Sequence, residues 1–201
     1  MNLKKIFHTN YTQVQQLFST SLLSITTSGT LAIILAYTLQ EAIPLSIIYT
    51  WLGIIFIGIT IRTTTVFLYR KNSNPKSESN EYKWLTRFRI SILITSIAWG
   101  TAGVLLFPHQ LINQMFLILI ISGLTTGAII AISADLLSSI TFILLVVSPL
   151  TLNLFLEQNK TSTTLGFITT LFLLFMILNL IYFNKKTTEN TNLQLKAIEN
   201  E

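Results

Sequence analysis

The feature that most constrains this chain is a long stretch without charge, residues 90–134, between Arg89 and Asp135. An ionised side chain costs about 2.5–3.5 kcal/mol at the centre of a membrane-inserted helix, so such a stretch suits lipid. Pro108 divides it into two runs, each close to the ~20 residues that cross a bilayer core of about 30 Å. The stretch therefore predicts a hairpin of two transmembrane helices.

The composition extends this prediction to the whole chain. Of the 201 residues, 51% are hydrophobic and only 10% are charged, whereas soluble domains carry roughly 25% charged residues. The fold class we predict is all-α, a polytopic membrane helical bundle. The absence of cysteine excludes disulfides and thiolate metal sites.

Six transmembrane helices account for the apolar segments. We predict them over residues 22–39, 43–61, 88–107, 111–132, 136–156 and 165–183. Arg62 is predicted to mark the exit of the second span, although the helix itself can continue through Tyr69. Residues 1–21 are predicted to be a cytoplasmic segment with a short interfacial helix, and residues 184–201 a cytoplasmic signalling-helix linker that looks interrupted.

The basic residues indicate the orientation. With six spans, Lys160 falls on one side of the membrane and the other 12 of the 13 Lys and Arg residues fall on the side of the termini. The positive-inside rule then places both termini in the cytoplasm. The net charge of +5 is thus explained by topology, and we predict no nucleic-acid partner.

Two rows of small residues stand out in the third and fourth predicted spans. Gly123, Gly127 and Ala131 follow each other at four-residue spacing, and Gly100 and Gly103 lie in the preceding span. Small residues let helix backbones approach closely in lipid. We expect the two rows to pack against each other within one bundle, with a dimer face or a ligand cleft as the alternatives.

Four other residues in or near the spans have polar or conformational roles to explain. The indole N–H of Trp99 needs an acceptor, and we expect a Ser or Thr rather than a ligand. Asp135 is expected to cap the fifth helix and stay hydrated, rather than to handle protons or cations. Pro149 should bend the fifth helix, and Asn153, one turn later, would then border a small cavity.

Catalytic chemistry has no candidate residues. The sequence contains no HExxH or GxSxG motif, no glycine-rich phosphate loop and no carboxylate pair. His8 and His109 fall on opposite sides of the predicted membrane. We therefore predict no enzymatic activity, no cofactor and no metal site for this chain.

The order of several stretches resembles a known family. KWLTRFR leads into IAWGTAGVLLFP and then QMFLILIISGLTTGAIIAISAD, a late Ser-Pro follows in the fifth span, and the tail contains LQLKAIENE. This order is similar to the six-span N-terminal membrane sensor domains of bacterial signalling proteins. Those domains precede histidine kinase, hybrid kinase or GGDEF diguanylate cyclase outputs, and the similarity covers about residues 45–201.

The resemblance implies a sensory input domain of signal transduction, including two-component systems, in the bacterial inner membrane. It would relay a stimulus through the sixth span to a kinase or cyclase output that is absent from this chain. The implied partners are the lipid bilayer, the output domain or a separate output protein, and a second copy joined through the C-terminal helix. The alternatives are a small six-span transporter or channel, and a membrane scaffold protein.

Overall fold

The computed structural model describes residues 11–71 and 78–199. The predicted interfacial helix therefore lies partly outside the described residues. Within them the chain is helical and contains no strand. The helices are α2 (Tyr11–Leu39), α3 (Leu45–Lys71), α4 (Glu78–Gly100), α5 (Ala102–Leu105), α6 (Leu111–Ile132), α7 (Leu136–Leu156) and α8 (Lys160–Glu199).

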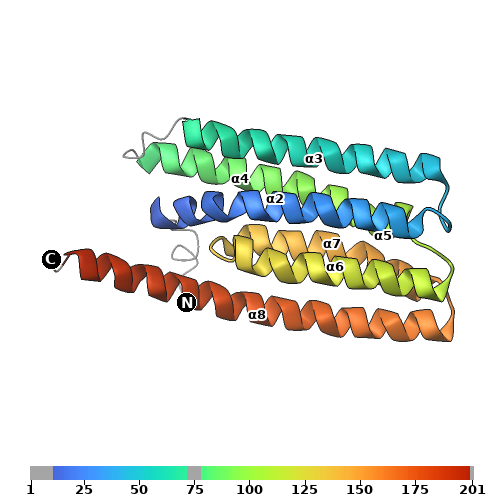
Figure 1. Ribbon diagram of the computed structural model, residues 1–201. Helices are drawn as coiled ribbons and strands as arrows, with labels where there is room; N and C mark the ends of the chain where they lie inside the picture. The colour runs from blue at the N-terminus through green and yellow to red at the C-terminus, as the bar shows by residue number, and fades with distance from the viewer. Residues whose placement is uncertain (1–10, 72–77, 200–201) are drawn as a thin grey trace.

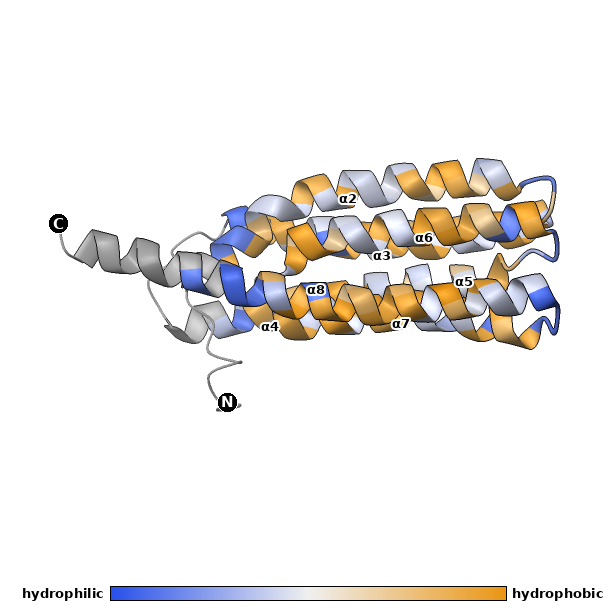
Figure 2. Ribbon diagram, turned by 90° about the horizontal axis from the view of Figure 1, so that it is seen from below, coloured by the Kyte–Doolittle hydropathy of each residue, from blue (hydrophilic) through white to orange (hydrophobic). Residues whose placement is uncertain are grey.

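Six of these segments are long and apolar enough to cross a membrane, which confirms the predicted fold class. They are Val14–Leu39, Leu45–Lys71, Tyr82–Leu105, Leu111–Ile132, Leu136–Leu156 and Lys160–Lys186. Apolar residues cover the middle of the bundle, and polar residues gather at its two ends (Figure 2). The chain is therefore a multi-pass membrane protein by length and composition of its helices.

The bundle consists of two three-helix halves (Figure 1). In the first half α3 packs against α2 and α4, and in the second α7 packs against α6 and α8. The halves meet where α4 contacts α7 and where α2 contacts α6. As a result, α3 and α8 lie at opposite edges, and α8 extends beyond the ends of its neighbours (Figure 1).

Short turns with local stop signals separate the helices. Pro44 directly precedes α3 and Pro108 follows α5, where a missing N–H removes no internal helix bond. Between α7 and α8, Gln158 adopts a positive φ of 52°, and the Asn159 side chain accepts a hydrogen bond from Thr161 N at 3.2 Å. This cap starts α8 at Lys160 rather than at the predicted residue 165.

Three helices are longer than predicted because no proline or turn residue interrupts them. Tyr11–Ser21 continues directly into the first span, so this described part of residues 1–21 is not a separate helix. α3 runs on to Lys71, two residues beyond the continuation through Tyr69 that the sequence allowed, so Arg62 lies within the helix and not at its end. α4 begins at Glu78, before the predicted residue 88.

Buried aromatic rings link the helices of the first half. Trp51 of α3 and Trp99 of α4 meet edge to face, with ring centroids 5.4 Å apart. Near the other end of α3, Phe18 of α2 stacks on Tyr69 at 3.9 Å, and Trp84 contacts both rings. Such pairs stabilise helix contacts beyond simple burial of area.

Candidate functional site

Gly100 and Gly103 provide a close contact between the two halves of the bundle, although not with the helix expected. A side-chain carbon at Gly103 would lie 2.6 Å from Leu150 N, and one at Gly100 would meet Leu145 O. The partner is therefore α7, not α6. Leu145 O is also the carbonyl that Pro149, four residues later, leaves without an N–H donor.

Asn153 belongs to the same junction. Its Nδ2 donates a hydrogen bond of 2.7 Å to Gly103 O across the α5–α7 interface. Pro149 and Asn153 also border a shallow, open apolar recess on α7. The structure thus brings Gly100, Gly103, Pro149 and Asn153 together as one close-packed junction.

Trp99 has the kind of partner that its position predicts. Its Nε1 donates a hydrogen bond of 2.8 Å to Ser28 Oγ of α2, and the ring is fully buried. The prediction of a Ser or Thr acceptor is confirmed. Trp51 donates from its Nε1 to Ala98 O at 3.3 Å, so both indoles of the pair are satisfied within the first half.

Gly123 and Gly127 do not serve close packing, and that prediction is wrong. Nothing lies within 4 Å of the position where a side-chain carbon would stand at either residue. Both glycines border a cavity, as does Ala131. Ala131 O accepts a hydrogen bond of 2.8 Å from Thr20 Oγ1 of α2. The row therefore forms one wall of a cavity, which is compatible with a ligand cleft, one of the two alternatives.

The cavity lies among α2, α3, α4 and α6 and has a volume of about 210 Å³. Its walls are mostly apolar, with hydroxyls from α2 and α4 and one cation. The lining residues include Ser24, Arg62, Thr95, Gly123 and Gly127. A cavity of this chemistry can hold a small, largely apolar ligand with one polar end.

Arg62 is the residue of this cavity that the sequence interpretation misplaced. Its side chain is only 3% exposed, because it falls on the buried stripe of α3 together with Trp51, Ile55 and Val66. That spacing of four and seven residues is the signal that could have found it. The helix itself continues beyond Arg62 to Lys71, as the predicted continuation through Tyr69 allowed.

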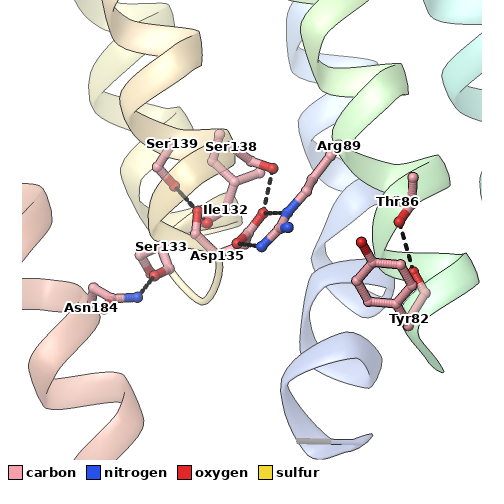
Figure 3. A network of polar contacts seen from close by, with 9 residues as sticks. All are labelled: Tyr82, Thr86, Arg89, Ile132, Ser133, Asp135, Ser138, Ser139 and Asn184. Carbon is pink, nitrogen blue, oxygen red and sulfur yellow. Dashed lines mark hydrogen bonds and ion pairs between the residues drawn. The ribbon is translucent and has the colours of Figure 1, made fainter. Parts of the chain in front are cut away.

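Asp135 takes part in an ion pair at one end of the bundle (Figure 3). Arg89 of α4 donates from Nε to Oδ2 at 2.9 Å and from Nη2 to Oδ1 at 2.8 Å. Ser138 Oγ donates to Oδ2 at 2.6 Å. This bidentate pair joins the first half of the bundle to the α6–α7 turn, a geometry that fixes orientation as well as distance.

The expected cap at Asp135 is only partly realised. Asp135 occupies the position before α7, but its carboxylate makes no hydrogen bond to the N–H groups of that helix. It is also buried, 6% exposed, rather than hydrated. The physical reason is that Arg89 and Ser138 already use the carboxylate oxygens.

The same turn contacts α8. Asn184 Nδ2 donates a hydrogen bond of 2.6 Å to Ser133 O, two residues before Asp135 (Figure 3). Ser139 Oγ donates to Ile132 O at 2.6 Å and so holds the turn together from inside. A chain of polar contacts therefore runs from α4 through the α6–α7 turn to α8.

Comparison of the chain with protein-family models, with curated proteins and with solved structures gave no match. The described residues contain no group of three or more His, Cys, Asp or Glu side chains that could hold a metal ion. On the geometry described above, the candidate sites are the cavity beside Arg62 and the polar contacts around Asp135.

Proposed function

We propose that this chain is a membrane-embedded sensory domain that passes a change in its bundle to a cytoplasmic output through α8. The observation that carries the proposal is the hydrogen bond from Asn184 to Ser133 O. It connects the helix that leaves the bundle to the turn that holds Asp135. Such a link lets a rearrangement of the packed core bias the position of the protruding helix.

The Arg89–Asp135 pair gives this relay two definable states. The pair lies between the two halves of the bundle, and Asp135 is buried while Arg89 is partly exposed, 21%. A stimulus that separates α4 from the α6–α7 turn would break a bidentate interaction and free the turn. The turn would then move Asn184 and rotate or displace α8.

The form of α8 supports transmission over distance. It is one helix from Lys160 to Glu199, while its membrane-spanning part ends at Lys186. A continuous helix converts a rotation at one end into a rotation at the other. The proposal includes an inner-membrane location with both termini cytoplasmic, supported by the asymmetry of basic residues, and a homodimer through α8. Thr188, Thr191, Leu195 and Ile198 follow the three-four-three spacing that starts a heptad seam, and these four positions lie outside the described side chains.

Substitution of Asn184 tests the relay. A kinase or cyclase reporter is fused after Glu201, and its output is measured at equal membrane abundance for Asn184→Leu and Asn179→Leu. Asn179 lies on the same helix but donates only to Phe175 O of α8 itself, which makes it a matched control. We expect Asn184→Leu to change output about five-fold or more, the range of ordinary coupling energies.

Helical phase provides a second readout. Insertion of one to four alanines between Lys186 and the reporter should change output with a period near 3.6 residues, because each insertion rotates the reporter by about 100°. Equal output from the two asparagine variants, together with no dependence on phase, would contradict a relay through α8.

A further inference from the structure

Arg62 is the only buried Lys or Arg side chain among the described residues, and it has no ion-pair partner there. Its Nη2 donates to Ser24 Oγ at 3.2 Å. Its Nε is buried and has no acceptor. Buried charges in proteins are normally paired, so this guanidinium needs an anion that the described chain does not supply.

Arg89 shows which group can pair with the Nε and Nη2 atoms of a guanidinium in this bundle. It uses Nε and Nη2 together to hold the two oxygens of Asp135 at 2.9 and 2.8 Å. On Arg62 the corresponding Nε has no acceptor, and Nη2 donates to the neutral hydroxyl of Ser24. The planar fork of a guanidinium matches a carboxylate in this geometry.

The other polar groups of the cavity are already engaged. Thr20 donates to Ala131 O, Thr95 to Ser91 O, and Ser28 accepts from Trp99. Ser24 donates no hydrogen bond to any described residue, so its hydroxyl can turn toward a second oxygen of a ligand. Ser28 is engaged only as an acceptor, so the free donors of the cavity among the described residues are Arg62 Nε and the hydroxyls of Ser24 and Ser28, one turn apart on α2.

The size and opening of the cavity limit the rest of the ligand. A cavity of about 150 Å³ holds benzene, so about 210 Å³ accepts a carboxylate with a few methylene groups, and the rest of a longer ligand must lie outside the cavity. Leu23 and Ile130 line it and are 74% and 73% exposed. Its mouth therefore opens sideways on the apolar surface between α2 and α6.

We infer that the Arg62 cavity binds the carboxylate of a fatty-acid-like amphiphile that enters from the bilayer. The carboxylate lies on Arg62 Nε and Nη2 with the Ser24 hydroxyl, and the first methylenes lie against Gly123 and Gly127. The remainder of the tail follows the α2–α6 seam into lipid. Binding does not depend on the relay proposed above, because it is measured on the chain itself, without a reporter.

The test uses the full chain in nanodiscs of zwitterionic lipid, with dodecanoate labelled with ¹³C at the carboxyl carbon. Nanodiscs without protein give the resonance of ligand dissolved in lipid, and a second resonance reports bound ligand. We expect saturable binding by the native chain, about ten-fold weaker competition by dodecanol, which lacks the charge, and no competition by phosphatidylglycerol.

Two variants examine the two halves of the site. Arg62→Gln removes the charge, and Gly127→Leu fills the cavity while leaving Arg62 in place. Gly53→Leu is the matched control, because Gly53 is an exposed glycine of α3 with nothing within 4 Å. Each of the first two should weaken binding at least about ten-fold, and the control should not change it.

Several outcomes would overturn the inference. These are the absence of a bound resonance, equal binding of dodecanol, displacement by phosphatidylglycerol, and undiminished binding by Gly127→Leu. Gly127→Leu decides the question alone if Arg62→Gln does not fold, as judged by its circular dichroism and thermal unfolding. A failed reporter assay with intact binding would reject only the relay.

Discussion

Gly103→Ala should destabilise the bundle, although alanine normally favours a helix over glycine. The added carbon would stand 2.6 Å from Leu150 N and 2.9 Å from Leu150 Cα, whereas carbon contacts are ordinarily 3.5–4.0 Å. The third span must therefore withdraw from the α7 backbone by about 1 Å. That shift also stretches the bond from Asn153 to Gly103 O, which is 2.7 Å long.

The magnitude follows from these two terms. Overpacking of a tight contact costs typically 1–3 kcal/mol, and an interhelical hydrogen bond contributes on average about 0.6 kcal/mol. Replacement of glycine in a helix returns roughly 0.5–1 kcal/mol. We expect a net loss of about 1–3 kcal/mol in the free energy of unfolding.

The assay is unfolding in mixed micelles with increasing sodium dodecyl sulfate, followed by the fluorescence of the buried tryptophans. Gly53→Ala and Gly127→Ala serve as controls, because nothing lies within 4 Å of the added carbon at either position. We expect these two to stay within about 0.5 kcal/mol of the native chain or to gain slightly. Gly103→Ala with the same stability as the controls would refute the close α5–α7 contact.

Two further predictions concern polar contacts. A double-mutant cycle of Arg89→Ala and Asp135→Ala should give a coupling energy of about 1–3 kcal/mol. The control pair is Lys185 and Glu189, which are exposed and 4.0 Å apart and should give a coupling energy of about 0–0.5 kcal/mol. Equal coupling energies for both pairs would argue against the buried bidentate geometry. Ser28→Ala leaves the Trp99 indole N–H without its acceptor and should cost about 1–3 kcal/mol in the same unfolding assay, whereas exposed Thr30, which bonds only within α2, should tolerate alanine.

The transmembrane helices could be predicted from the sequence because lipid imposes a simple rule on charge. The fourth and fifth spans match α6 and α7 at both ends, Leu111–Ile132 and Leu136–Leu156, since Pro108 and Asp135 interrupt the apolar runs there. The outer ends of α2, α3 and α4 were less predictable. Polar residues outside the membrane do not by themselves end a helix, so a helix that leaves the membrane continues until a cap or a proline stops it.

The partners of the helices were harder to predict than the helices themselves. Gly100 and Gly103 resemble Gly123 and Gly127 in the sequence, yet the first two touch the α7 backbone and the other two border empty space. Hydropathy carries no information about which neighbour faces a helix. The contact of Gly100 with Leu145 O also depends on Pro149, which lies far along the chain and acts by removing a donor.

Arg62 shows where a charge rule for membranes can mislead. A lone arginine near the end of an apolar run usually marks the membrane edge, because its long side chain reaches water there. In α3 the residues at positions 48, 51, 55 and 66 share the buried stripe with Arg62, and nine further residues separate it from the end of the helix. At 1.5 Å per residue that is about 14 Å of helix. A cation buried in the bundle beside a cavity, with no carboxylate partner among the described residues, costs stability unless something pairs with it, and the unpartnered Nε therefore points to a ligand.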